Sequence, residues 1–347
     1  MKQLLWVLSV GMVMSTGVSS AQETQKLGDI VSQVQMRYGP YAVAVKDNFA
    51  FATDGSKIRV YDLSNPADPK EITVIEDKFA NPEFRSLFVD GNFLYAGSVP
   101  ISGQDHGVFI FDITNPEKPS SLGKWDDGKT VAHGLFVSGG KAFVSGSDGS
   151  HGRLVIVDVS DPKNPKTLGT YQSSSNKGYS KPWNSGNYVY VSDADGYLRI
   201  LDVSNPSSIK EVGSYKYPGK SGHEPQGKQV VVMGNTLYMA DWGAGFISID
   251  ISDPTNPKPL DVITHEEVED GTDVYAVAID GNTAYVANGW GGLVWVDISD
   301  KSDIKVSHQI NPKYTTYLDI ALMGDYAVCS DKGGFTNKPG LDIVKVK

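Results

Sequence analysis

Leu154-Val155-Ile156-Val157-Asp158-Val159-Ser160-Asp161-Pro162 is the stretch that sets the pattern of this chain. A short apolar run rich in β-branched residues ends at an aspartate, and Ser, Asp and Pro follow. β-Branched residues favour strands, Pro fixes φ and ends a strand, and Ser and Asp side chains bond nearby backbone N–H groups in turns. The stretch therefore predicts a strand followed by a tight turn.

The same pattern returns along the whole chain. Its aspartate, the marker, falls at positions 62, 112, 158, 202, 250 and 297, and Lys345 takes that place in a seventh copy. Consecutive markers lie 44 to 50 residues apart, which fits four short strands with their turns, as in propeller blades of about 40–50 residues. Because turn residues follow each marker, we interpret the marker aspartates as structural rather than catalytic.

The repeat predicts an all-β fold, a seven-bladed β-propeller with four-stranded blades. Period-two alternation and Gly-rich turns place the blades at about 40–76, 84–126, 131–172, 179–218, 226–264, 273–310 and 315–347. The seventh unit stops after its third strand, so its outer edge needs a partner from elsewhere. The β-like stretch 30–36 is predicted to close the ring there, within a single domain of residues 22–347.

Residues 1–21 read as a secretory signal peptide, with Lys2, an apolar stretch over residues 4–14 and small residues before position 22. The alternative is a membrane anchor, but Ser15 interrupts the roughly 18 apolar residues that a membrane span needs. We therefore expect an exported protein that is periplasmic, at the cell surface or secreted. No membrane insertion is expected after signal cleavage.

Charge and cysteine content narrow the classes of partner. Loss of residues 1–21 removes Lys2 and no acid, so the formal net charge goes from −10 to −11. Nucleic-acid binding needs clustered Lys and Arg, so no nucleic-acid partner is expected. The single cysteine, Cys329, excludes an intramolecular disulfide and lies in an apolar alternating run, which indicates a buried inert thiol. We expect a monomer without a cofactor.

These residues resemble a known family. Residues 154–158 spell the name of the LVIVD repeat, and the Val-Ser-Asp-Pro continuation and the spacing also match, over about residues 28–347. The resemblance implies exported bacterial or archaeal propellers, often at the cell surface and mostly without an assigned activity, and it supplies no catalytic motif. The departures are Lys345 in the seventh copy and Lys301 where the turn Pro would be.

Aligning the blades on their first turns predicts which residues surround the mouth of the central channel, where propellers usually bind ligands. The first column is Tyr41, Arg85, His133, Ser180, Lys228, Tyr275 and Leu318. The next is Ala42, Ser86, Gly134, Lys181, Gln229, Ala276 and Asp319. Phenols and cations thus gather opposite Asp319, and Arg and Lys would hold a carboxylate, sulfate or phosphate. The alternative is an ordinary polar channel lining.

Loops expected on the same face add acids and tryptophans. The acids are Asp148, Asp193, Asp195 and Asp241. Trp242 and Trp290 could form a platform for a sugar ring or pack on neighbouring loops. The segment from Asp193 to Gly196 resembles half a calcium loop, but it lacks the later carboxylate. His133, His223 and Glu224 lack zinc spacing, so no metal is expected.

Three functions remain open. The first is a binding module for an anionic small molecule, a glycan or an envelope protein, through Tyr41, Arg85, His133, Lys181, Lys228, Trp242, Tyr275, Trp290 and Asp319. The second is a lyase or hydrolase acting on an acidic glycan, in which Arg85 neutralises the carboxylate while His133 with Tyr41 or Tyr275 handles protons. The third is a scaffold without a ligand, because a closed ring is stable alone.

Overall fold

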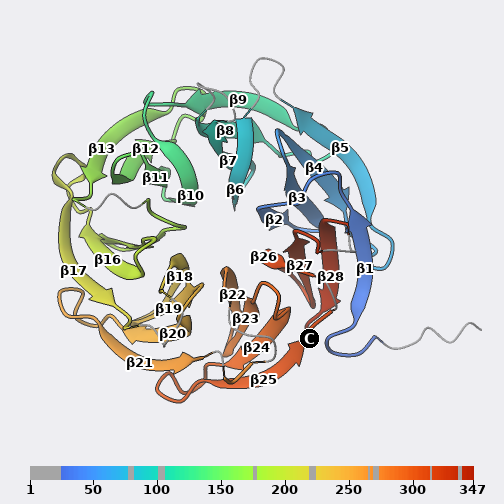
Figure 1. The fold of residues 1–347 in the computed structure, drawn as a ribbon. Coiled ribbons are helices and arrows are strands. Elements are labelled where there is room, and N and C mark those ends of the chain that lie inside the picture. Colours follow the sequence, from blue (N-terminus) through green and yellow to red (C-terminus); the bar gives the residue numbers. More distant parts are fainter. Residues whose placement is uncertain are drawn as a thin grey trace, which may run out of the picture.

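The computed structural model describes residues 25–76, 82–100, 106–174, 178–218, 224–264, 266–268, 273–312, 315–334 and 338–347. Seven four-stranded antiparallel sheets stand around a central axis (Figure 1). The all-β, seven-bladed propeller predicted from the repeat is therefore confirmed. Within the described residues the only helical element is the short 3-10 turn η1 (Pro206–Ser208), and no helix is long and apolar enough to cross a membrane.

Blades 1 to 6 run outward from the axis in sequence order (Figure 1). Blade 1 holds β2 (Val43–Lys46), β3 (Phe49–Asp54), β4 (Lys57–Asp62) and β5 (Lys70–Glu76). Blade 2 holds β6 (Pro82–Asp90), β7 (Phe93–Pro100), β8 (Gly107–Asp112) and β9 (Ser120–Trp125). Blade 3 holds β10 (Val131–Ser138), β11 (Lys141–Ser147), β12 (Gly152–Asp158) and β13 (Lys166–Gln172).

The next three blades repeat this order. Blade 4 holds β14 (Trp183–Ser185), β15 (Tyr188–Ser192), β16 (Tyr197–Asp202) and β17 (Lys210–Lys216). Blade 5 holds β18 (Gly227–Met233), β19 (Thr236–Asp241), β20 (Gly245–Asp250) and β21 (Lys258–Ile263). Blade 6 holds β22 (Ala276–Asp280), β23 (Thr283–Ala287), β24 (Leu293–Asp297) and β25 (Lys305–Ile310).

Blade 7 is built from two distant parts of the chain. It holds β26 (Tyr317–Met323), β27 (Tyr326–Asp331) and β28 (Gly340–Lys345), and its outermost strand is β1 (Ile30–Gln35), which pairs antiparallel with β28 (Figure 1). The Gln33 side-chain amide donates a hydrogen bond of 2.9 Å to Asp342 Oδ1 across this pair. The edge of β28 is therefore covered by another strand.

The core lies between neighbouring blades rather than inside each one. Among the described residues, seven clusters of buried side chains each join two adjacent blades, as where Phe51 of blade 1 packs with Phe84 and Phe109 of blade 2. A strand with packed sheets on both sides is buried on both faces and reads as a continuous apolar run. This explains why the third strand of a blade carries a run such as residues 154–157.

The marker aspartates have the turn role that the sequence predicts. The carboxylate of Asp158 accepts the backbone N–H of Ser160 at 3.0 Å, and every other marker aspartate accepts the N–H two residues further on in the same way. Hydrogen bonding to the Ser160 hydroxyl and N–H lowers the pKa of Asp158, so the turn favours the ionised carboxylate.

In blades 3 to 5 the turn proline also joins the blade to the one before it. A Cβ built on Gly169 of β13 would collide with the carbonyl oxygen of Pro206, and Cβ atoms on Gly123 and Gly213 would collide with those of Pro162 and Pro254. Lys301 stands where another turn has Pro, and its carbonyl oxygen accepts a hydrogen bond of 2.8 Å from Ser248 of blade 5. The contact between blades is thus made by the backbone carbonyl of the turn residue and not by the proline ring. This explains why lysine is tolerated at position 301.

Candidate functional site

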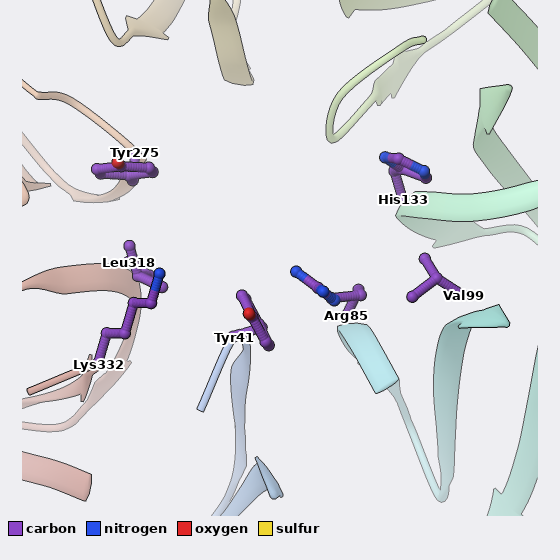
Figure 2. A pocket seen from close by; sticks show the side chains of 7 residues that line it. All are labelled: Tyr41, Arg85, Val99, His133, Tyr275, Leu318 and Lys332. Carbon is purple, nitrogen blue, oxygen red and sulfur yellow. The ribbon is translucent and has the colours of Figure 1, made fainter. Parts of the chain in front are cut away.

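A cavity of about 450 Å³ opens at the mouth of the channel. Its lining residues are Tyr41, Arg85, Val99, His133, Tyr275, Leu318 and Lys332 (Figure 2). Five of these belong to the first predicted column and come from blades 1, 2, 3, 6 and 7. The volume falls within the range of about 300–1,000 Å³ typical of small-molecule sites. We call it the mouth cavity.

β-Bulges release several column residues from strand pairing. The register between the first two strands shifts in blades 2, 3, 5 and 7, which leaves Arg85, His133, Lys228 and Leu318 without a pairing partner. A bulge bends the strand and re-aims the side chain of its extra residue. The backbone thus directs the side chains of Arg85, His133 and Leu318 into the mouth cavity.

Arg85 is held in place by two neighbours. Its guanidinium carbon lies 3.7 Å from the centre of the Tyr41 ring, and its Nη2 donates to Glu83 Oε1 at 2.8 Å. Its Nε is buried and has no hydrogen-bond partner among the described residues. A buried donor without a partner carries a free-energy penalty, which an acceptor on a ligand would relieve.

His133 faces Tyr275 across the cavity (Figure 2). His133 is surrounded by protein, but its side chain is accessible from the open cavity. The surrounding protein and the positive charge of Arg85 both lower the pKa of His133. Burial raises the pKa of Tyr275, Asp273 adds to the rise, and a hydrogen bond with Trp242 opposes it. At neutral pH the cavity therefore presents a neutral imidazole and a protonated phenol.

Lys181 and Asp319, both from the second column, form an ion pair across the channel. Lys181 Nζ lies 2.6 Å from Asp319 Oδ1, and the two residues belong to blades 4 and 7, which are as far apart as a ring of seven allows. Asp319 also accepts the N–H groups of Val43 at 3.1 Å and Ile320 at 3.0 Å. The sequence predicted that Asp319 would face cations, and in the structure it contacts one of them, Lys181, directly. The Lys181 charge is therefore already paired within the protein.

Three other predicted residues do not line the mouth cavity. Lys228 Nζ donates to Gln226 Oε1 at 3.3 Å and lies 5.8 Å from the centre of the Tyr275 ring, and burial lowers its pKa. Trp242 is half-buried beside Tyr275, whereas Trp290 is 46% exposed. The tryptophans therefore have different surroundings.

The loop acids bind their own backbone. Asp241 accepts N–H groups from Gln226, Gly243 and Ala244. In the segment that resembles half a calcium loop, Asp193 accepts the N–H groups of Asp195 and Tyr197 and pairs with Arg199 Nε at 2.8 Å. Asp148 accepts those of Ser150 and His151.

Across the described parts of the chain, no group of three or more His, Cys, Asp or Glu side chains could hold a metal ion. One of the three residues considered for zinc, His223, lies outside those parts.

Two lining residues were not predicted. Val99 lies near the end of β7, and Lys332 directly follows β27, so both stand at the ends of second strands. An alignment of first strands alone leaves such positions out. The signal for Lys332 was the long segment from Asp331 to Pro339, which separates two strands of the last blade.

Seven repeated blades around a polar central cavity define a β-propeller repeat protein, a class with interaction and scaffold roles. The model of the LVIVD repeat matches residues 41–76, 84–127, 130–173, 183–217, 226–259 and 271–311. The chain belongs to the LVIVD repeat family. Comparison with curated proteins finds no match.

Solved structures share the fold at low sequence identity. The WD40 repeats of RRP9 align with a TM-score of 0.73 at 9% identity, covering 93% of this chain and 99% of that one. A chain of the mitotic checkpoint complex aligns with a TM-score of 0.70 at 13% identity, covering 100% and 99%. The computationally designed Ika8 protein aligns with a TM-score of 0.62 at 12% identity, covering 92% and 99%. These likenesses concern the fold alone.

Proposed function

We propose that this chain is an exported binding protein that holds a carboxylate-bearing ligand in the mouth cavity. One observation carries the proposal: residues from five blades gather around one cavity in which the buried Nε of Arg85 lacks an acceptor. Planar guanidinium groups bind carboxylates through paired hydrogen bonds. Export rests on the signal-like residues 1–21, which lie outside the described residues.

The surrounding groups favour an anion. Lys332 brings a second cation to the cavity, and the phenols of Tyr41 and Tyr275 add hydroxyl donors. Glu83 neutralises part of the Arg85 charge, so a ligand carboxylate would have to compete with it or bind the free Nε. The whole chain carries a formal net charge of −10, so the cations of this cavity are a local feature. They would favour an anionic ligand over a neutral one.

Isothermal titration calorimetry of residues 22–347 with galacturonate tests this function, and galactose is the neutral counterpart. We expect saturable binding of galacturonate that weakens with added salt. Loss of a hydrogen bond to a charged group costs about 1.5–3 kcal/mol, so Arg85→Gln should weaken binding by about 10–100-fold. Lys305→Gln, which removes a 67% exposed cation on an outer strand, is the matched control. Equal binding of galactose, or equal affinities of the two variants, would contradict the proposal.

A second candidate is an enzyme acting on an acidic glycan. The observation in its favour is that His133 lines the same cavity as the phenols of Tyr41 and Tyr275. Burial and Arg85 lower the pKa of His133, which favours an imidazole able to accept a proton. The test is release of new reducing ends from polygalacturonate. Turnover that is lost in both His133→Ala and Tyr275→Phe would support catalysis, and turnover unchanged in both would remove it.

A further inference from the structure

A second cavity of about 520 Å³ adjoins the mouth cavity. Its lining residues are Tyr38, Gly39, Tyr41, Gly55, Ser56, Glu83 and Lys332. Tyr41 and Lys332 line both cavities. Gly55 and Ser56 lie between β3 and β4 of blade 1, so the second cavity extends from the channel mouth over that blade. The two cavities are therefore neighbours, and we call them together the groove.

The second cavity is lined by an exposed aromatic ring, that of Tyr38. Tyr38 is 53% exposed, yet its backbone N–H donates to Asp54 Oδ1 at 2.9 Å. Asp54 is itself held by Arg59. One edge of the ring lies 3.4 Å from where a Cβ on Gly55 would stand, an ordinary contact distance, so the ring lies beside that turn. The backbone of Tyr38 is thus anchored while its ring faces solvent.

Cations follow the groove. Arg37 lies 5.3 Å from the centre of the Tyr38 ring, Lys332 lines both cavities, and Arg85 lines the mouth cavity. Neither Arg37 nor Lys332 has an ion-pair partner in the part of the chain that the structure describes. Among the residues that line either cavity, the one acid is Glu83, and it is bound to Arg85. A ligand with repeated negative charges would suit this set of cations.

Building on the proposed function, we propose that the groove binds an acidic oligosaccharide of two or more units. The carboxylate of one unit pairs with Arg85 in the mouth cavity, and the next ring lies on Tyr38 with its carboxylate near Arg37 and Lys332. A pyranose presents a flat C–H face to an aromatic ring and hydroxyl groups to polar side chains. Clusters of cations also recognise acidic peptides, but the exposed ring of Tyr38 offers a stacking face for a pyranose, and tetraglutamate tests the peptide alternative below.

The experiment compares galacturonate with tetragalacturonate, maltotetraose and tetraglutamate by calorimetry on residues 22–347. We expect tetragalacturonate to bind at least roughly tenfold more tightly than galacturonate, the equivalent of about 1.4 kcal/mol for the added contacts. The ratio of the two affinities should fall toward one in Tyr38→Ala and in Arg37→Gln. Leu27→Ala, which trims another exposed apolar side chain, should keep the ratio of the unaltered protein.

The outcomes separate this inference from the proposed function. If galacturonate binds through Arg85 but chain length adds nothing, or Tyr38→Ala leaves the ratio unchanged, the extended groove is refuted and the mouth cavity stands. If tetraglutamate binds as tightly as tetragalacturonate, the sugar class is refuted. If maltotetraose binds equally well, the acidic character is refuted. If neither galacturonate nor its oligomer binds, both proposals fall.

Discussion

Replacing Asp319 with alanine should destabilise the propeller through the centre of the ring. The substitution removes the partner of Lys181, 2.6 Å away across the channel, and two hydrogen bonds from the backbone of Val43 and Ile320. Val43 is 4% exposed, so its N–H would lose its acceptor in a place that water reaches poorly. The three bonds link blades 4, 7 and 1, which no other single side chain described above does.

The size of the effect follows from burial. Breaking a buried ion pair costs about 3–5 kcal/mol, but the Lys181 side chain keeps 22% of its exposure and channel water can solvate it. We therefore expect about 1–3 kcal/mol from the ion pair after discounting for that solvation. An orphaned backbone N–H adds about 1–3 kcal/mol. The total expected for Asp319→Ala is about 2–6 kcal/mol.

Urea unfolding followed by tryptophan fluorescence measures this in a double-mutant cycle of Asp319→Ala and Lys181→Met. The cycle isolates the pairwise energy from the lost backbone bonds, and we expect a coupling of about 1–3 kcal/mol. Asp325→Ala breaks a surface pair with Lys345 whose carboxylate is 59% exposed, and exposed pairs contribute little. A coupling near zero, or equal losses for Asp319→Ala and Asp325→Ala, would refute the reasoning.

Two further predictions concern a joint between two blades and a buried carboxyl inside blade 7. Gly169→Ala places a Cβ against the Pro206 carbonyl oxygen and should lower the free energy of unfolding by about 1–3 kcal/mol through overpacking. Gly178→Ala, whose Cβ would meet only ordinary contacts from 3.4 Å, is the control and should be nearly neutral. Equal urea midpoints for the two variants would contradict the close contact between Gly169 and Pro206. Burial raises the pKa of Asp342 above its ordinary 3.8, so the folded state favours the protonated carboxyl, and the resulting stabilisation is present at low pH and lost as pH rises through the folded pKa. The melting temperature of Asp342→Asn should therefore rise relative to that of the unaltered protein between about pH 4 and pH 8, and a constant difference would show that Asp342 does not titrate in this way.

The repeat made the architecture readable from the sequence. The apolar run recurs seven times, the marker aspartate six times and the turn proline five times, so a local error at one blade is corrected by the others. The alternation that marks the first strand weakens in blade 4, and there the structure has the three-residue β14, while Lys181 bonds to the backbone of Lys228 in the next blade. Strand prediction is weakest where a segment leaves its own sheet to bind a neighbour.

The channel mouth was harder to predict, because its geometry depends on features that carry no sequence signature. Aligning first turns brought together Tyr41, Arg85, His133 and Tyr275, since equivalent strands start at equivalent heights. The bulges that aim Arg85 and His133 depend on backbone pairing. Lys332 reaches the cavity from a loop of a length found in no other blade, and only coordinates place such a loop.

The contact between Gln33 and Asp342 joins residues that are 309 positions apart. A ribosome must therefore synthesise nearly the entire ring before β1 can find β28, and until then the early strand has no partner of its own blade. The entropic cost of closing a loop grows only slowly with its length, so the separation along the chain adds little to the free-energy cost of pairing β1 with β28. The delay before β28 is synthesised matters more. During that interval β1 is an unpaired strand that could join another chain, and a domain-swapped dimer made by exchange of β1 is the misassembly to which this design is most exposed.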